Sequence, residues 1–433
     1  MNSNFSRNDK GHLLIEGIDT IELGNRFGTP LYVVCEEKVR NNYRNFKKNF
    51  TKYYDKNIVA YSYKTNFLPA ICTILKNEGA WAEIVSALEL SIARKIQVNP
   101  SKIIFNGPCK SDEVLLEALR LGVSVINIDS LSELERLSNL IHKTGITANV
   151  GVRLHNPFEK GKIPSRFGLD IKKAFTACKL IGKNQRMNYR GIHIHLGTQI
   201  TNINSYIMII KYAADFMANL HSKLDLNTIF LNIGGGFPSH QKPLYAIDDP
   251  WPAPSLKEYA SKIGSTLEAN HNKINYPYLV LEPGRAIVSS SSYLITKIVA
   301  IKSIDRAGKW IILDSGLNIV PEAEYFYYKT IPASHHKGER EKVHIGGPLC
   351  MLEDIIGLNR RLPKLQEGDI LVIPDVGAYN ISLSWQFIKP RPNICMIHKN
   401  GVELIRKTET VDDILRLDSI PKHLITNQIA KED

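Results

Sequence analysis

The sequence contains little cysteine and no long apolar runs, and each shortage excludes a class of protein. Its 433 residues include six cysteines, and no two of them have the spacing of a C-x-x-C pair, so we expect neither a disulfide framework nor a zinc site. No apolar run is long enough to cross a bilayer, and residues 1–7 lack the apolar core of a signal peptide. The sequence therefore predicts a protein of the reducing cytoplasm that has no membrane partner.

Acidic residues are also fewer than basic ones. The chain has 55 lysines and arginines against 43 aspartates and glutamates, which gives a formal net charge of +12. No nucleic-acid-binding motif accompanies this charge, so we expect a soluble basic protein without a nucleic-acid partner. A basic surface would still attract an acidic substrate or an acidic carrier protein.

Eight short apolar runs alternate with amphipathic stretches between about residues 40 and 282. Ser111 and Ser130 stand at expected helix starts, each followed by apolar residues three and four positions apart. This rhythm over roughly 240 residues predicts an α/β fold, a (β/α)8 TIM-type barrel, with a doubly wound open sheet as the alternative. The predicted strands are 58–61, 81–85, 103–105, 123–128, 147–154, 191–195, 228–233 and 278–281.

The pattern changes after Glu282, where few long helical stretches occur. Four later segments alternate as strands do, so we expect a mainly β C-terminal domain. The strand predicted at 31–35 precedes the barrel, and we expect it to join this domain. The boundaries are then 39–281 for the barrel, and 1–38 with 282–433 for the β domain. The four segments are 289–301, 309–313, 369–373 and 394–398.

Function in such a barrel collects at the C-terminal ends of the strands. Lys64 directly follows the first predicted strand. A partly desolvated ammonium has a lowered pKa, and the neutral amine then forms a Schiff base with an aldehyde. The later strand ends supply what an aldehyde cofactor, pyridoxal 5'-phosphate (PLP), requires.

Two of these strand ends suit the phosphate and the ring of PLP. Gly234, Gly235 and Gly236 follow the seventh strand and leave backbone amides free to turn toward a phosphate; a tight turn is the alternative. Glu282 follows the eighth strand, where its carboxylate would keep a pyridine nitrogen protonated. The alternative for Glu282 is an ion pair with Arg285 that closes a turn.

Two histidines, His193 and His195, alternate along the predicted sixth strand and so share one of its faces. Metal binding is conceivable from that spacing, but no carboxylate or cysteine ligand is nearby in the sequence, so we expect no metal. A His195 imidazole stacked on the cofactor ring fits better, with Thr198 donating to the phosphate.

Together these segments resemble the fold-type III PLP-dependent decarboxylases, most closely the diaminopimelate decarboxylase branch. The resemblance covers nearly the whole chain, and the combination of motifs is highly specific. It implies a barrel plus a β domain, built as a homodimer with active sites shared at the interface. The matching segments are 28–33, 63–66, 106–110, 129–130, 166–168, 193–200, 234–237, 282–285, 347–350 and 377–379.

The resemblance also implies which residues carry the chemistry. Lys64 would hold PLP as an internal aldimine, His195 would stack on the ring, and Glu282 would pair with the pyridine nitrogen. Cys350 of the partner subunit would protonate the carbanion after carbon dioxide leaves. The other cofactor-binding residues implied are Glu83, Arg153 after the fifth strand, Thr198, Gly234, Gly235, Gly236, Arg285 and Tyr379.

Two departures from the family pattern concern the substrate. Met351 stands directly after the cysteine where a glutamate is usual, and Val320 replaces an arginine of a β-domain segment. Neither side chain pairs with a charged distal end, and unpaired substrate charges cost several kcal/mol. Glu83 in place of an aspartate is conservative. We therefore expect decarboxylation of an amino acid or amino-acid-derived intermediate, free or tethered to a carrier protein, as in specialised relatives that act on siderophore intermediates.

Three other functions stay open. The first is a true diaminopimelate decarboxylase of lysine biosynthesis. The second is an amino-acid racemase on a related barrel, which would lack the cysteine-bearing motif at 347–350. The third is a catalytically silent homologue, and the joint presence of Lys64 and Cys350 argues against it.

Overall fold

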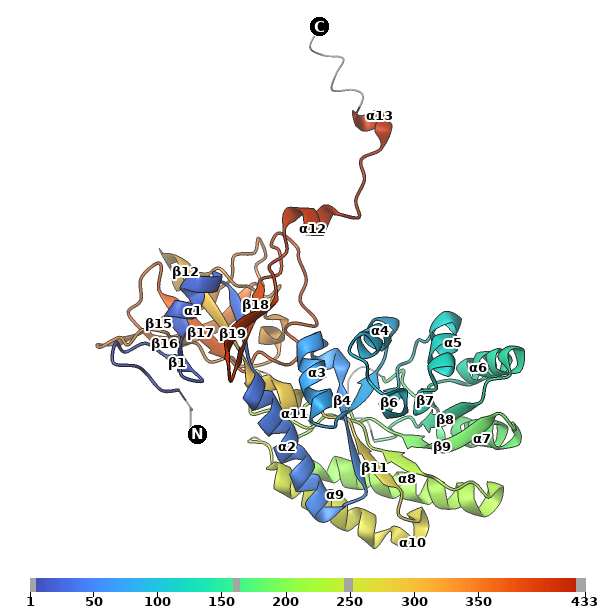
Figure 1. Ribbon diagram of the computed structural model, residues 1–433. Helices are drawn as coiled ribbons and strands as arrows, with labels where there is room; N and C mark the ends of the chain where they lie inside the picture. The colour runs from blue at the N-terminus through green and yellow to red at the C-terminus, as the bar shows by residue number, and fades with distance from the viewer. Residues whose placement is uncertain (1–4, 159–163, 245–251, 426–433) are drawn as a thin grey trace.

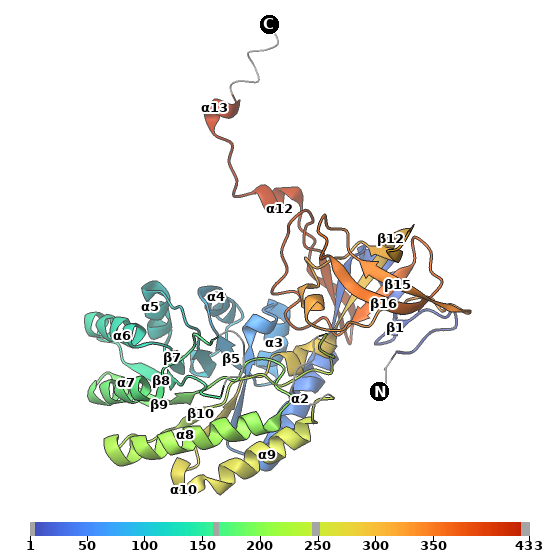
Figure 2. The same cartoon turned by 180° about the vertical axis from the view of Figure 1, so that it is seen from behind.

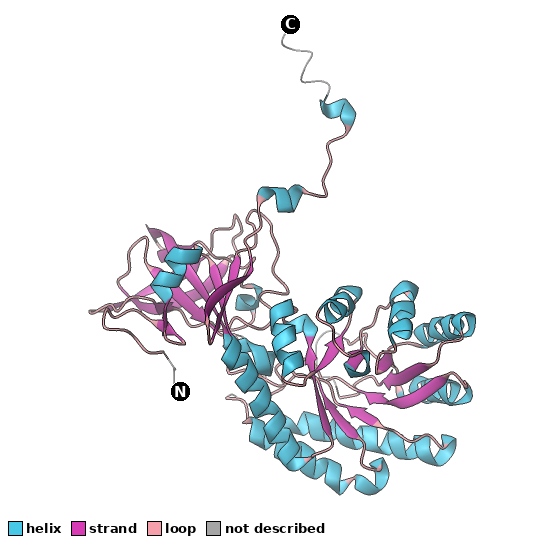
Figure 3. Ribbon diagram, in the orientation of Figure 1, coloured by secondary structure: helices cyan, strands magenta, loops and turns pink. Residues whose placement is uncertain are grey.

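The computed structural model of the chain describes residues 5–158, 164–244 and 252–425. It consists of a barrel of parallel strands ringed by helices and, beside it, a domain built mainly of strands (Figures 1 and 3). The view from behind shows the same two units, with the last helices extending away from both (Figure 2). Within the described ranges, no helix is both long and apolar enough to span a membrane.

The eight barrel strands are parallel and close on themselves in chain order, with the last strand beside the first. This confirms the predicted (β/α)8 barrel and excludes the open sheet, which would leave two strands unpaired at its edges. The strands are β4 (Asn57–Ser62), β5 (Trp81–Ile84), β6 (Ile103–Phe105), β7 (Val125–Ile128), β8 (Ala148–Arg153), β9 (Met187–His193), β10 (Phe230–Asn232) and β11 (Tyr278–Leu281).

The sixth barrel strand differs from its prediction at both ends. β9 begins at Met187, and residues 187–190 alternate between buried and more exposed positions as a strand does. The strand ends at His193, so His195 lies beyond it rather than on it. The expectation that both histidines belong to one strand is therefore wrong.

Amphipathic helices cover the outside of the barrel. Ser111 and Ser130 cap α5 and α6, because their side chains accept hydrogen bonds from Val114 N and Glu133 N. These two predicted helix starts are confirmed. The helices in and around the barrel are α2 (Glu36–Tyr53), α3 (Pro69–Asn77), α4 (Ala87–Lys95), α5 (Asp112–Leu121), α6 (Leu131–Thr144), α7 (Ile171–Lys183), α8 (Ile203–Leu224), α9 (Leu256–Ala269), α10 (His271–Ile274) and α11 (Arg285–Val288). Three others lie outside it: α1 (Thr20–Phe27) in the second domain, and α12 (Val411–Leu415) and α13 (Lys422–Ile425) toward the C-terminus.

The interior of the barrel is layered, because every second residue of a strand points inward. An apolar cluster fills the lower part with Ile58, Ala60, Ile104, Val125, Phe230 and Val280. Two positions further along their strands, the inward residues are polar: Ser62, Asn106, Asn127, Asn232 and Glu282. The alternation therefore sets an apolar plug below a polar layer at the C-terminal end of the strands.

The second domain is a nine-stranded sheet. Its first strand in the chain, β3 (Leu31–Cys35), pairs antiparallel with β12 and parallel with β18, which confirms that a strand ahead of the barrel joins this domain. The other strands are β12 (Ser292–Ile304), β13 (Gly308–Leu313), β14 (Ile331–Pro332), β15 (Arg340–Gly346), β16 (Ile355–Pro363), β17 (Ile370–Pro374), β18 (Asn393–His398) and β19 (Gly401–Arg406). A two-stranded hairpin, β1 (Leu14–Ile15) with β2 (Ile18–Asp19), lies ahead of α1.

Candidate active site

The strand ends bring most of the predicted residues to one end of the barrel. Lys64 lies in a short 3-10 turn, Tyr63–Thr65, directly after β4, and Arg153 is the last residue of β8. The glycines at 234–236 follow β10, and Glu282 follows β11. Because the strands are parallel, these carboxyl ends share one face of the barrel.

Lys64 is held between two side chains of neighbouring strands. Its Nζ lies 2.6 Å from Ser62 Oγ and 2.6 Å from Glu83 Oε2. Glu83 is 1% exposed, whereas the Lys64 side chain is 36% exposed, so the amine is accessible to an incoming aldehyde.

The charge state of Lys64 differs from its prediction. Burial acts to lower the pKa of Lys64, but the carboxylates of Glu83 and Glu282, together with Tyr379, oppose it and raise the pKa above its usual value. The expectation of a lowered pKa is therefore wrong, because the sequence does not reveal how many anionic groups face the amine. Lys64 is an ammonium held by a carboxylate.

Glu282 lies at the centre of the polar layer. Its Oε1 accepts hydrogen bonds from Asn106 Nδ2 at 2.8 Å and from Asn232 Nδ2 at 2.6 Å, and His193 Nε2 lies 3.5 Å from its Oε2. Burial acts to raise the pKa of Glu282, but His193, Lys64 and the hydrogen bonds outweigh it and hold that pKa well below its usual range. The carboxylate is therefore ionised at neutral pH, despite being 4% exposed.

His195 is a neutral imidazole with a fixed ring. Burial, together with the charges of Lys64 and Arg153, lowers its pKa to about 3. Its Nδ1 accepts a hydrogen bond from Gly235 N at 3.1 Å, so the ring proton resides on Nε2. This hydrogen bond joins the loop after β9, which carries His195, to the glycine turn after β10.

The glycine turn has no room for side chains. A Cβ at Gly235 would lie 2.3 Å from the carbonyl oxygen of Glu282, and one at Gly234 would lie 2.4 Å from His195 Nδ1. Gly234 and Gly236 also have φ angles of +68° and +90°, which favour glycine. The glycines are therefore required for close approach of the backbone at the barrel mouth.

Arg285 presents unused donors at the start of α11, three residues after Glu282. Its Nη2 pairs with Glu322 Oε2 at 2.6 Å, and its guanidinium lies over the rings of Phe326 and Tyr379 at 4.6 and 4.9 Å. Its Nε and Nη1 are buried and have no partner among the described residues, and the same holds for Thr65 Oγ1. The ion pair of Arg285 is thus made with Glu322, and not with Glu282 as the alternative from the sequence proposed.

Two predicted residues are exposed. Thr198 lies in the loop that follows β9, and this loop packs on the glycine turn, because Ile200 N donates to Gly236 O at 2.8 Å. Cys350 is exposed in the connection between β15 and β16, and among the described residues no hydrogen bond or ion pair joins it to the barrel. Figures 1 and 2 place these two strands in the β domain, away from the barrel.

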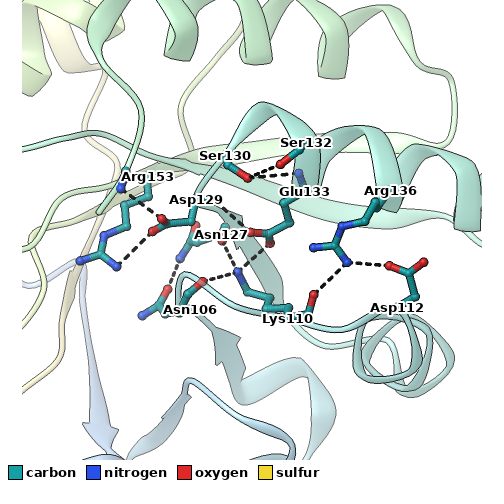
Figure 4. A network of polar contacts seen from close by, with 12 residues as sticks. Asn106, Lys110, Asp112, Asn127, Asp129, Ser130, Ser132, Glu133, Arg136 and Arg153 are labelled. Atoms are coloured by element: carbon teal, nitrogen blue, oxygen red, sulfur yellow. Dashed lines mark hydrogen bonds and ion pairs between the residues drawn. The ribbon is translucent and has the colours of Figure 1, made fainter. Parts of the chain in front are cut away.

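A second polar network, which sequence reasoning missed, supports Arg153 (Figure 4). Arg153 Nη1 lies 3.2 Å from Asp129 Oδ1, and Asp129 N donates to Glu133 Oε2 at 3.3 Å. Glu133 Oε1 pairs with Lys110 Nζ at 2.7 Å, and Lys110 Nζ also donates to Asn127 O at 3.0 Å. The network joins β6, β7 and β8 through groups that are almost fully buried.

The sequence analysis also missed residues of the polar layer, although their spacing from the apolar strand residues could have indicated them. Asn106, Asn127 and Asn232 follow an inward apolar residue by two positions, as Glu282 does. Glu89 is different: it reaches back from α4 to accept a hydrogen bond from Val85 N at 2.6 Å, and nothing in its sequence neighbourhood indicates this contact.

These features fit PLP. The glycine turn and the unpaired donors of Arg285 and Thr65 suit a phosphate, because buried donors without partners are costly unless an anion satisfies them. The ionised carboxylate of Glu282 suits a protonated ring nitrogen, and the accessible Lys64 amine suits an aldehyde.

Comparison with known proteins agrees with this fit. Residues 36–289 match the pyridoxal binding domain of the pyridoxal-dependent decarboxylases. The chain is 35% identical over 432 residues to the diaminopimelate decarboxylase of Methanocaldococcus jannaschii, covering 96% of this chain and 97% of that protein. It is 32% identical to the enzyme of the same name from Methanothermobacter thermautotrophicus, covering 96% and 98%.

Solved structures agree over the same length. The diaminopimelate decarboxylase of M. jannaschii in complex with L-lysine matches with a TM-score of 0.90, at 35% identity, over 98% of this chain and 99% of that chain. The Helicobacter pylori enzyme in complex with L-lysine gives a TM-score of 0.83 at 25% identity, over 92% and 99%. This chain therefore belongs to the fold-type III PLP-dependent decarboxylases, which are carboxy-lyases that use pyridoxal 5'-phosphate.

Proposed function

We propose that this carboxy-lyase removes carbon dioxide from an amino acid, or an amino-acid-derived intermediate, other than meso-diaminopimelate. PLP-dependent decarboxylation of a small amino-acid substrate follows from the family. The observation that carries the proposal about the substrate is Val320. Its side chain is 0% exposed within the apolar core, where the family pattern has an arginine.

Four groups of the barrel mouth would hold the cofactor. Lys64 would bind the aldehyde carbon, and Glu282 would pair with the ring nitrogen. Arg285 and the amides of the glycine turn at 234–236 would hold the phosphate, with Tyr379 beside them. When bound, PLP supplies a protonated ring that accepts the electron pair left behind by the carboxylate.

The surrounding side chains keep these groups in the required charge states. Glu282 stays ionised through Asn106, Asn232 and His193. His195 stays neutral, and its ring plane is held by Gly235 N, so it provides a flat surface without a competing positive charge. Glu83 and Ser62 position the Lys64 amine.

The proton that replaces carbon dioxide would come from a second copy of the chain. Cys350 is exposed and lies between β15 and β16, outside the barrel of its own chain. Met351 and Leu352 beside it are also exposed, at 38% and 89%, which is costly for apolar side chains in water. We infer a homodimer in which the Cys350 thiol of the partner subunit delivers a proton to the carbon that lost carbon dioxide.

The distal end of the substrate would lack the partners that diaminopimelate needs. A buried Val320 has neither a donor nor a positive charge to offer a carboxylate, and the Met351 sulfur is a weak acceptor for an ammonium. The substrate would thus carry a different distal group and would be free or tethered to a carrier protein.

A product assay tests this proposal. We expect diaminopimelate to be at least about a hundredfold poorer in kcat/KM than the true substrate, equivalent to roughly 2.7 kcal/mol of transition-state binding. The panel should include lysine, ornithine, arginine, glutamate and carrier-tethered amino acids. Rapid formation of lysine from diaminopimelate with ordinary saturation would contradict the proposal.

Two variants of Met351 test whether this position selects the distal group of the substrate. Met351→Glu adds a carboxylate, and Met351→Gln is its neutral match at a half-exposed position. We expect Met351→Glu to raise kcat/KM for diaminopimelate about tenfold above Met351→Gln, since a charged hydrogen bond contributes about 1.5 kcal/mol. Equal values for the two variants would show that position 351 does not select the distal ammonium.

The second candidate is a true diaminopimelate decarboxylase. The similarity to enzymes of that name over nearly the full length favours it. The same product assay separates the two candidates.

A further inference from the structure

A groove of about 740 Å³ lies where the C-terminal strand meets the barrel. Its walls come from Phe67 ahead of α3, from Ser382 and Ser384 in the loop after β17, and from the segment between β19 and α12. Four basic and two acidic side chains line it. The groove belongs to neither the glycine turn nor the polar layer of the barrel.

Both acidic side chains of the groove are already committed to other partners. Glu409 pairs with Arg391 Nη1 at 2.7 Å and accepts from Arg391 N at 2.9 Å. Asp413 caps α12, where it accepts hydrogen bonds from Thr410 N at 2.9 Å and Thr410 Oγ1 at 2.8 Å. Arg391 is neutralised by its own pair, so the basic charge that remains belongs to other residues.

Arg406, Lys407 and Arg416 supply that remaining charge. Among the described residues, the side chains of these three form no hydrogen bond or ion pair, and only the backbone of Arg406 is paired, with Ile394 in β18. Arg406 is partly buried at the end of β19, and burial together with the nearby Arg391 lowers its pKa, although Glu409 and Tyr32 oppose this. A guanidinium in that position is costly unless an anion binds beside it.

We propose that this groove is a binding site for a phosphate or carboxylate group of a small ligand, held by Arg406, Lys407 and Arg416. Planar guanidinium groups bind both kinds of anion with two parallel hydrogen bonds, and Lys407 adds a point charge at the rim. The site goes beyond the proposed function, because it lies outside the barrel mouth and requires no particular amino-acid substrate.

The groove touches the turn that carries Lys64. Ser382 Oγ donates to Thr65 O at 3.1 Å, and Tyr379 N donates to the same carbonyl at 2.8 Å. An anion in the groove therefore binds against the loop that fixes Thr65, next to Lys64. Occupancy of the site is expected to change the absorbance of PLP bound at Lys64.

Calorimetric titration of the PLP-loaded enzyme tests the proposal. Loading with PLP fills the phosphate site of the barrel, so inorganic phosphate then reports on the groove. We expect saturable binding at low ionic strength, weakened at least about tenfold by Arg406→Gln, equivalent to about 1.4 kcal/mol. A parallel titration with citrate identifies the source of the anion: tighter binding of phosphate indicates a phosphorylated ligand, and tighter binding of citrate a carboxylate ligand.

Matched surface variants keep the test valid if Arg406→Gln does not fold. Lys407→Gln should weaken binding about threefold or more, whereas Lys399→Gln, the same change in the turn between β18 and β19, should leave it unchanged. Absence of saturable binding to the wild-type enzyme, or an equal loss in Lys399→Gln, would overturn the proposal. Both outcomes are independent of whether the enzyme decarboxylates any amino acid in the panel.

Discussion

Local structure positions Lys64, whereas residues distant in the sequence set the charge state of its amine. It leaves β4 in a 3-10 turn, and its amine contacts Glu83 from the next strand. The carboxylate holds the lysine as an ammonium, so a bound aldehyde must compete with that ion pair. Glu83 therefore acts as a positioning residue for the amine.

Replacing Lys64 should remove the cofactor from its covalent site. We expect Lys64→Ala to lower kcat by at least about a hundredfold, because it deletes the nucleophile. Borohydride reduction followed by peptide mapping should label Lys64 in the wild type and leave the variant unlabelled. The exposed Lys95→Ala serves as control, and an adduct mapped to any other lysine would contradict the assignment.

Glu89 makes the stability of this enzyme depend on pH. Burial, helped by the charge of Glu83, raises the pKa of Glu89 from 4.5 to about 7. The folded protein thus holds this proton more tightly than the unfolded chain does. The stabilisation is complete below pH 4.5 and is lost as the pH rises toward 7.

A neutral replacement should remove this dependence. The free energy of unfolding of Glu89→Gln, relative to the wild type, should rise by up to about 3 kcal/mol between pH 4.5 and pH 8. Gln Oε1 keeps an acceptor for Val85 N. Urea denaturation at several pH values measures the difference, and Glu135→Gln, the same change at an exposed position, serves as the control.

At the scale of elements, a buried ion pair joins the loop between β6 and α5 to α6. The side chains of Lys110 and Glu133 are 0% and 2% exposed, with Nζ and Oε1 2.7 Å apart. Burial lowers the pKa of Lys110 and raises that of Glu133, although the attraction between the two opposes both shifts. Burial therefore opposes the charged form of both groups, and the attraction between them offsets part of that cost.

A double-mutant cycle should measure the coupling free energy between Lys110 and Glu133. Lys110→Met leaves a buried carboxylate without its partner and should destabilise the fold by about 3–5 kcal/mol. Adding Glu133→Gln should recover at least about 1 kcal/mol, because no unpaired charge then remains. Thermal and urea denaturation measure both. Strict additivity of the two single variants would contradict the coupling.

At the scale of the whole molecule, one chain does not bring all of the predicted residues together. The barrel collects Lys64, His195 and Glu282, whereas Cys350 lies in the β domain and has no polar contact with the barrel among the described residues. A two-fold dimer would complete both sites equally, because its interface is self-complementary.

Mixing inactive chains tests the shared site. Lys64→Ala and Cys350→Ala chains, allowed to exchange, should restore up to about a quarter of wild-type activity. Roughly half of the dimers are then mixed, and each mixed dimer holds one intact site. Gel filtration and mass spectrometry establish the exchange, and no recovery after proven exchange would count against a site built from two chains.

The sequence by itself determined the barrel, the N-terminal strand of the β domain and the strand-end positions of Lys64 and Glu282. These features depend on the spacing of apolar residues, which is two in a strand and about three and a half in a helix. That spacing is visible within a short segment of the sequence. The sequence did not reveal β15 and β16, because consecutive charged residues, 340–342 in β15 and 360–361 in β16, leave few apolar side chains to mark the alternation.

Only the tertiary structure decided which side chains meet. The carboxylate that holds Lys64 lies 19 residues away, and the partner of Arg285 comes from the β domain as Glu322. Pairing of β4 with β5 sets the first contact, and the position of the β domain against the barrel sets the second. The groups that surround Lys64 and Glu282 in space set the raised pKa of Lys64 and the lowered pKa of Glu282. Charge states depend on the distance between groups in space, and a linear pattern carries no information about that distance until the chain has folded.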